Sequence, residues 1–290
     1  MTVYENPWAK SYSYLRTAMV GLLVALGVAV FYQAWTQHFH VLSSVSAYYY
    51  TPAQGIFVGS LIGLGAAMIA LLGISLVEDV FLNLGGMFAM VVAIVPTSRG
   101  SDYRTAVRAC QQVATPLLTE RSPTASLDCP TVTALATATK ANIENNMSTL
   151  LVVGVLGILA TLLFARRHRE TVPLWAFAAA LLVFLAEGVT FLAARDFFID
   201  NAHFASAIGL LVCVVVVALV NARRSRDDKA VKLHRNGYAW IALSLVVAAV
   251  LGTILMLTGV IALFWVEIVV ALLFAVFWMV QTVEQARAVP

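Results

Sequence analysis

Two glutamates lie inside long apolar runs of the sequence, where an ionisable side chain carries a high free-energy cost. Glu187 falls in the run 172–193, and Glu267 in the run 262–282. Insertion scales give an acid at the centre of a membrane helix a cost of roughly 2.5–3.5 kcal/mol. Each carboxyl therefore needs a cation, a water-filled cavity or a hydrogen-bond partner on another helix. Function and structure explain Glu187 equally well, whereas Glu267, nearer the end of its run, fits a structural role better.

A second polar group follows the first apolar run. Residues 43–52 read Ser-Ser-Val-Ser-Ala-Tyr-Tyr-Tyr-Thr-Pro, and Gln33 precedes them. Tyrosines are common at membrane interfaces, which is the simplest explanation for this segment. Three consecutive tyrosines cannot all face lipid, so we expect at least one hydroxyl to point toward protein or a cavity. Ser46, Tyr48 and Tyr50 are therefore candidates for a polar pocket.

A third polar group contains Asp200 and His203. Asp200 is suited to cap a helix that begins after it, with His203 in the first turn. A histidine there can carry a proton, bind a metal or only form a hydrogen bond. His38 and His40 are further possible metal ligands, but no His-x-x-x-His or Cys-x-x-Cys pair accompanies them. We therefore expect no metal and no cofactor.

The composition identifies the elements that must position these groups. Apolar residues make up 61% and charged residues 11%, against roughly 45–50% and about 25% in an ordinary soluble domain. A soluble protein of this size has no interior large enough for so much apolar surface. The chain is therefore expected to lie in a lipid bilayer.

The apolar runs match the hydrocarbon thickness of a bilayer, which needs about 20 helical residues. They predict an all-α polytopic transmembrane helical bundle of about eight spans in a single membrane domain. Only Thr258 and Gly259 separate the last two runs, so seven spans stay open as the alternative. The predicted spans are 15–35, 55–77, 80–97, 148–165, 172–193, 203–222, 238–260 and 262–282.

The basic residues predict the orientation. They concentrate in clusters at 166–169 and 223–235 beside apolar runs, which indicates cytoplasmic segments and places both termini in the cytoplasm. We expect Glu78 and Asp79 to pair with one of these clusters. The net charge of +3 is this orientation signal and does not indicate nucleic-acid binding, because no soluble domain presents it.

Residues 98–147 form the longest polar segment, a predicted extracytoplasmic loop in which a helical pattern resumes from Thr131. We expect Cys110 and Cys129 to form a disulfide there, since that compartment is oxidising. Cys213 lies within a span and is expected to be a packing residue. A helix-packing face in the second span is predicted at glycines spaced by four, namely Gly55, Gly59 and Gly63.

Three short motifs resemble signatures of an uncharacterised bacterial family of multi-pass membrane proteins. They are Ser46–Pro52 with Phe57-Val58-Gly59, then Val95-Pro96-Thr97, and His203-Phe204-Ala205-Ser206-Ala207. The resemblance covers about the first six spans and implies that these residues face a shared feature at the outer ends of the helices. It also implies a bacterial inner membrane. A more distant similarity is to the six-span DRAM/Sfk type, from which no settled chemistry carries over.

Three classes of function stay open. The leading hypothesis is a non-enzymatic protein whose outward-facing polar pocket binds or passes a small molecule, ion or lipid. One alternative is a membrane-embedded metal-dependent lipid hydrolase of the ceramidase or adiponectin-receptor kind, which Ser46, Asp200 and His203 resemble in type. The other is an accessory subunit, with a membrane protein or a second copy as partner. The expected pocket residues are Gln33, Ser46, Tyr48, Tyr50, Glu187, His203 and Glu267.

Overall fold

The computed structural model describes residues 7–39, 41–97, 129–168, 173–227 and 236–288. These residues form eight α-helices and one short 3-10 helix and contain no strand, which confirms the all-α prediction. The helices are α1 (Pro7–Thr36), η1 (Ser46–Tyr50), α2 (Gln54–Ala70), α3 (Leu76–Ile94), α5 (Cys129–His168), α6 (Leu174–Ala193), α7 (Arg195–Asp227), α8 (Gly237–Leu257) and α9 (Leu263–Ala288).

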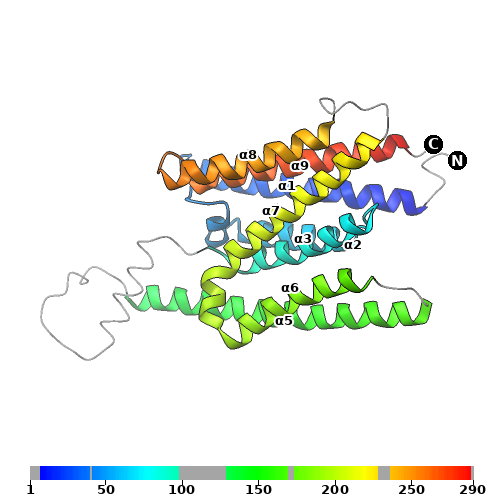
Figure 1. The fold of residues 1–290 in the computed structure, drawn as a ribbon. Helices are drawn as coiled ribbons and strands as arrows, with labels where there is room; N and C mark the ends of the chain where they lie inside the picture. The colour runs from blue at the N-terminus through cyan, green and yellow to red at the C-terminus, as the bar shows by residue number, and fades with distance from the viewer. Residues whose placement is uncertain (1–6, 40, 98–128, 169–172, 228–235, 289–290) are drawn as a thin grey trace, which may run out of the picture.

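Successive α-helices run in opposite directions along the bundle, so that α1 begins and α9 ends at the same end (Figure 1). Within the described residues, 7 helices are long and apolar enough to cross a membrane. The eighth, α2, has 17 residues, which gives about 25 Å against about 30 Å of hydrocarbon. The chain is thus a multi-pass membrane protein. The predicted break after the seventh span is confirmed, since Gly259 separates α8 from α9 at a φ of 73°.

Six helices close into a ring. In order around the ring, α1 packs on α2, α2 on α3, α3 on α7, α7 on α8, α8 on α9, and α9 returns to α1. The hairpin of α5 and α6 lies outside the ring, against α3 and α7 (Figure 1). The ring interior is therefore the place where side chains from distant parts of the sequence meet.

The turn between α2 and α3 falls earlier than predicted. The span expected over 55–77 ends at Ala70, and α3 begins at Leu76 instead of residue 80. The reason is a cap: the Ser75 hydroxyl accepts a hydrogen bond from the backbone N–H of Glu78 at 3.2 Å, a Ser-x-x-Glu helix start.

The predicted loop 98–147 is shorter than expected, because α5 already begins at Cys129. The resumption of helix near Thr131 is thus confirmed. The predicted Cys110–Cys129 disulfide lies outside the described residues, since Cys110 is in the segment 98–128 and the Cys129 side chain is likewise not described. Cys213 is buried, as expected of a packing residue.

Asp200 does not cap a helix, which corrects that prediction. Only Ala194 separates α6 from α7, and α7 starts at Arg195, so Asp200 lies on the exposed surface of its second turn. Surface ion pairs connect this first part of α7 to α5. Lys140 Nζ lies 2.8 Å from an oxygen of Asp196, and Arg195 Nη1 lies 3.2 Å from an oxygen of Glu144.

Of the three glycines predicted to form a packing face, only Gly63 lies at a contact between helices, since a Cβ there would lie 3.0 Å from Cδ1 of Leu22 in α1. Gly55 and Gly59 have no neighbouring atom within 4 Å of a hypothetical Cβ, so they face outward. A Cβ on Gly65 of α2 would lie 2.6 Å from the carbonyl oxygen of Gly86 of α3, and the reverse distance is 2.5 Å. α2 and α3 are in close contact at this glycine pair, which helical periodicity alone does not indicate.

Glu78 pairs with neutral side chains instead of a basic cluster, which also corrects the prediction. Its carboxylate is 1% exposed and accepts hydrogen bonds from Asn221 Nδ2 at 3.0 Å, Gln281 Nε2 at 2.8 Å and the backbone N–H of Ile74 at 3.0 Å. Glu78 is the residue whose backbone N–H is capped by Ser75, and its side chain is buried inside the ring. Glu78 thereby joins α3, α7 and α9 near the end of the ring that carries the chain termini.

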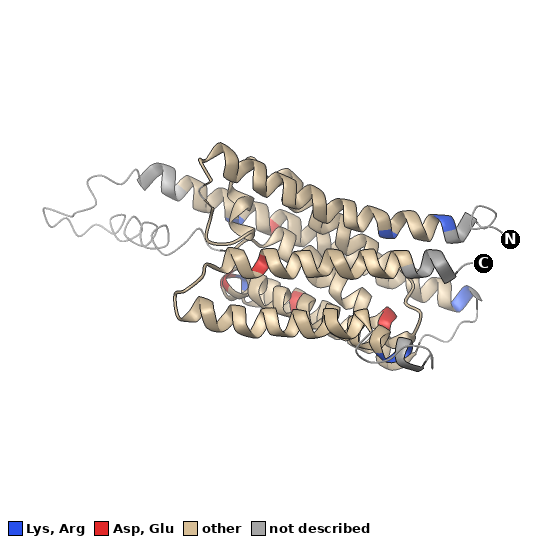
Figure 2. Cartoon of the chain, turned by 90° about the horizontal axis from the view of Figure 1, so that it is seen from above, with Lys and Arg blue, Asp and Glu red and all other residues tan. Residues whose placement is uncertain are grey.

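Most of the described basic residues lie at that same end (Figure 2). Lys140 and Arg195, in contrast, belong to the opposite end, where each is paired with an acid. This distribution agrees with the charge bias from which the orientation was predicted. The basic residues at the end with the termini are Lys10, Arg16, Arg166, Arg167, Arg223 and Arg224.

Candidate functional site

A cavity of about 170 Å³ lies inside the helix ring. It receives side chains from α1, η1, α2, α3, α7, α8 and α9, and none from the α5–α6 hairpin. The lining residues are Leu23, Leu26, Val45, Ser46, Phe57, Leu61, Leu64, Val92, His203, Ala207, Leu210, Leu211, Val214, Leu245, Glu267, Val270, Ala271 and Phe274.

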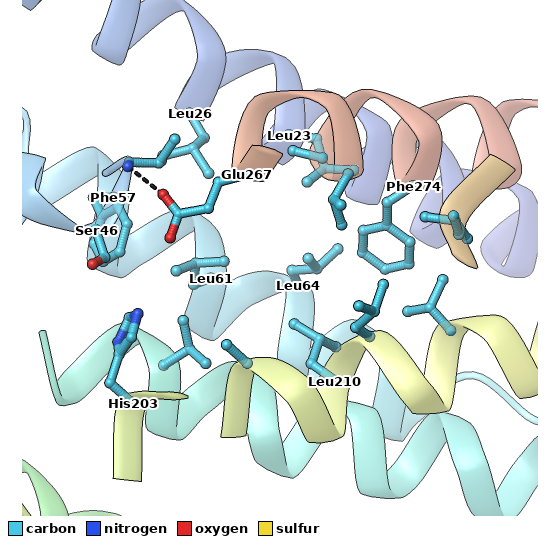
Figure 3. A pocket seen from close by; sticks show the side chains of 18 residues that line it. Leu23, Leu26, Ser46, Phe57, Leu61, Leu64, His203, Leu210, Glu267 and Phe274 are labelled. Carbon is cyan, nitrogen blue, oxygen red and sulfur yellow. Dashed lines mark hydrogen bonds between the residues drawn. The ribbon is translucent and has the colours of Figure 1, made fainter. Parts of the chain in front are cut away.

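Three polar side chains lie at one end of this cavity. Figure 3 shows Glu267, Ser46 and His203 gathered there, while Leu64, Leu210 and Phe274 lie at the other end. The polar end is formed by the last residues of α3, the early turns of α7 and α9, and η1. By helix direction this is the end of the bundle opposite the chain termini (Figure 1).

Glu267 joins α9 to the segment before η1. Its Oε2 atom accepts a hydrogen bond from the backbone N–H of Val45 at 2.5 Å. A second link, from the backbone N–H of Phe264 to the carbonyl oxygen of Ser43 at 2.9 Å, holds the same segment against the start of α9. The backbone N–H of Ser46 also interacts with the Glu267 carboxyl group, and in Figure 3 the second carboxyl oxygen points toward the cavity.

His203 is fixed by the end of α3. Its Nδ1 lies 2.6 Å from the carbonyl oxygen of Val95, the residue that follows α3, and this oxygen has no donor within that helix. A carbonyl only accepts, so Nδ1 carries the hydrogen. In the neutral tautomer that carries this hydrogen, Nε2 is the acceptor nitrogen of the ring. The side chain is only 3% exposed, so this nitrogen is directed into protein or cavity and not to bulk solvent.

Ser46 belongs to a group of buried hydroxyls next to the cavity. Ser46 Oγ lies 2.6 Å from Thr97 Oγ1, and Ser44 Oγ lies 3.3 Å from the same atom. The Tyr50 hydroxyl donates to the carbonyl oxygen of Thr97 at 2.8 Å. A tyrosine hydroxyl thus points into protein, as predicted. These bonds hold η1 against the segment that follows α3.

The remaining surface of the cavity is apolar. Leucines from α1, α2, α7 and α8 form most of it, together with the rings of Phe57 and Phe274. Phe57 and Leu64 are almost completely buried, so the walls are packed from behind by the hydrophobic core. Preformed pockets with apolar walls and a few convergent polar groups are typical small-molecule sites.

The structure brings together part of the predicted pocket. Ser46, His203 and Glu267 line the cavity. Gln33, Tyr48 and Tyr50 do not line it, although both tyrosines lie in η1 directly beside it. Glu187 is on α6, outside the ring, where its Oε1 atom is buried without a hydrogen-bond partner.

The four potential metal ligands do not assemble among the described residues. His38 is exposed, with a positive φ of 54° at the end of α1, and Asp200 is exposed on α7, whereas His203 is buried in the ring. His40 lies outside the described residues. No three His, Cys, Asp or Glu side chains in the described part of the chain are placed to hold one metal ion.

Sequence reasoning did not identify the backbone and hydroxyl partners of the site. The amide of Val45, the carbonyl of Val95 and the hydroxyl of Thr97 orient the three polar side chains. Thr97 belongs to the Val95-Pro96-Thr97 motif, which by itself predicts no hydrogen bond for its hydroxyl. A backbone group carries no sequence signal of its own, so no pattern could have indicated the other two.

Comparisons with family models, curated proteins and solved structures find no match to this chain. The resemblance to the bacterial family with the tyrosine motif therefore stays a prediction. What can be said of the site rests on its own geometry and chemistry.

Proposed function

We propose that this membrane protein binds a small amphiphilic molecule in the cavity inside the helix ring, without chemically transforming it. The observation that carries the proposal is the convergence of Ser46, His203 and Glu267 at one end of an otherwise apolar cavity. The three residues come from three separate segments of the chain. A ligand with an apolar body and one polar head matches this division of the lining.

The size of the cavity supports a small ligand. Its volume is about 170 Å³, and an apolar protein cavity of about 150 Å³ is known to hold benzene. A single aromatic ring or a short branched chain, with a head of a few atoms, is therefore the expected size. A whole lipid is much too large, although one end of its chain could enter.

The orientation places the polar end of the cavity on the outer side. The basic helix ends fit the cytoplasmic side, and the polar end of the cavity is opposite them. The bacterial inner membrane remains the proposed location, and a Cys110–Cys129 disulfide on its outer side remains part of the proposal. Passage of the ligand would require the ring to open, because the buried core of Leu64, Met68 and Phe274 closes the inner side in this structure.

The test uses two small probes and a variant that fills the cavity. Binding of para-fluorotoluene and para-fluorobenzyl alcohol to the purified protein is followed by fluorine NMR line broadening. Ala207 lines the cavity on α7, so Ala207→Leu should abolish the broadening. Ala205 is exposed on the same helix, and Ala205→Leu is the matched control that should leave it unchanged.

Equal broadening in the wild type and in Ala207→Leu would mean that the probes enter only the detergent or the surface, and the proposal would be wrong. If neither probe shows line broadening with the wild-type protein, the proposed function is also wrong. A melting curve of each variant shows that it is folded before the comparison is made.

The two alternatives have less support from the described residues. A lipid hydrolase needs several metal ligands close together, and such a group is lacking in the part of the chain that the structure describes. An accessory subunit would use an apolar outer face, which the α5–α6 hairpin offers. Lipid covers such a face equally well, so the hairpin does not favour a protein partner.

A further inference from the structure

We infer that the ligand of this cavity carries a positively charged, hydrogen-bond-donating head, as a protonated primary amine does. The inference rests on the proposed function and names the chemical class of the ligand. It follows from what Glu267 and His203 present to the cavity and from the absence of a cationic partner for Glu267 within the described residues.

The first step concerns hydrogen-bond capacity. One carboxyl oxygen of Glu267 accepts from the Val45 amide, and the other faces the cavity. His203 uses its N–H on the Val95 carbonyl and keeps the Nε2 lone pair. The polar end therefore offers acceptors from two sides, and a head that donates hydrogen bonds complements them.

The second step concerns charge. A carboxylate in an apolar site is stable only with a compensating partner, and without one the group takes up a proton. The ion pairs among the described residues are Lys140–Asp196 and Arg195–Glu144, both on the surface beside α5. Among the described residues, no lysine, arginine or histidine nitrogen lies within 4.0 Å of a Glu267 carboxyl oxygen, the distance limit for an ion pair. An ammonium group of the ligand would supply this missing charge.

The third step concerns discrimination between heads. Ser46 is already bonded to Thr97 and adds only a hydroxyl at the edge of the site. No cationic side chain lines the cavity, so an anionic head would meet Glu267 without compensation. The two phenyl rings of the lining, Phe57 and Phe274, are compatible with a cation or an aromatic body. A carboxylate ligand should accordingly be rejected.

The experiment compares four probes that share one ring and differ in the head: para-fluorobenzylamine, para-fluorobenzyl alcohol, para-fluorotoluene and para-fluorobenzoate. Dissociation constants are measured by fluorine NMR at neutral pH, where the amine is protonated and the benzoate ionised. In the wild type the amine should bind at least about tenfold more tightly than the alcohol or toluene, the factor expected for a charge-assisted hydrogen bond. Benzoate should bind most weakly.

The variant Glu267→Gln removes the charge but keeps an oxygen that can accept from the Val45 amide. It should weaken binding of the amine about tenfold and change binding of the alcohol by less than about threefold. The wild-type series does not depend on this variant, so the inference stays testable if Glu267→Gln fails to fold.

Different results contradict the amine inference and the proposed binding function. If the alcohol and toluene bind and lose binding in Ala207→Leu, while the amine binds no more tightly than the alcohol, the cavity is a binding site and the amine inference is wrong. Unchanged affinity for the amine in a folded Glu267→Gln variant would also overturn it. If none of the four probes binds, the proposed function itself fails.

Discussion

The carboxylate of Glu267 and the backbone N–H of Val45 form a hydrogen bond of 2.5 Å between parts of the chain that are 222 residues apart in sequence. Glu267 belongs to α9, and Val45 precedes the short helix η1, which forms the polar end of the cavity. The same side chain thus closes the fold at that end and presents a polar group to the cavity. A structural and a binding role are combined in one residue.

The bond predicts how the segment around Val45 responds to substitution. Glu267→Leu leaves the Val45 amide without an acceptor, so its hydrogen exchange should rise markedly, whereas Glu267→Gln still offers an oxygen and should preserve protection. Hydrogen–deuterium exchange with mass spectrometry on a peptide from 42–50 measures this. Equal exchange in the two variants would show that the bond does not hold the segment.

The contact between α2 and α3 predicts opposite effects for two glycines of the same helix. Gly65→Ala places a methyl group against the carbonyl oxygen of Gly86, at 2.6 Å, so the helices must separate. We expect a loss of about 1–3 kcal/mol in unfolding free energy, as for an overpacked core. Thermal melting in detergent should show a clearly lower midpoint.

The control for that experiment is Gly59→Ala. A Cβ at Gly59 meets no atom within 4 Å, and alanine is favoured over glycine in a helix by about 1 kcal/mol. This variant should melt at the same temperature as the wild type or slightly higher. A similar loss in both variants would mean that the approach of α3 to Gly65 is not the cause of the loss.

The buried carboxylate of Glu78 predicts a strong dependence of stability on that side chain. Glu78→Ala would leave the Gln281 amide and the Ile74 backbone N–H without this acceptor, while Asn221 keeps its bond to the Val217 carbonyl oxygen. Since each buried unsatisfied group costs about 1–3 kcal/mol, the melting temperature should fall substantially. Glu144→Ala removes a surface ion pair with Arg195 and should cost less than about 1 kcal/mol. Similar losses in both variants would contradict the central place of Glu78.

The tyrosines of η1 predict a loss of stability in alkali. Burial raises the pKa of Tyr48 and Tyr49 above the ordinary value of 10.0. The folded state therefore favours the protonated phenols, and this contribution is complete below the unfolded pKa. It is lost as the pH rises through the folded pKa, because the unfolded chain ionises first. Melting temperatures measured from about pH 9 to about pH 11 should fall less steeply in Tyr49→Phe. An identical slope would mean that other groups cause the loss.

The sequence was sufficient for the parts of the structure that depend on local composition. Long uncharged runs predict membrane helices because backbone groups in lipid must be satisfied within the helix. The number of helices and the break at Gly259 followed from this rule. Helix ends followed less well, because caps such as Ser75 are short signals inside a longer apolar run.

The residues of the candidate site could likewise be predicted only in part from the sequence. Rare polar residues in apolar surroundings indicated Ser46, His203 and Glu267, which line the cavity. The same reasoning also indicated Glu187, which lies outside the ring on α6. The sequence shows that a buried carboxyl group needs a partner, but it does not show whether that side of the helix faces the interior of the ring.

Sequence alone thus determined that the chain is a bundle of apolar helices with a few polar groups among them. Only the tertiary structure decided that α1, α2, α3, α7, α8 and α9 close a ring while α5 and α6 stay outside it. It also decided that Glu78 bonds to Asn221 and Gln281 instead of a basic cluster. The physical reason is that hydropathy is a property of each segment, whereas the pairing of helices depends on close contacts such as Gly65 against Gly86, which exist only once both helices are in place.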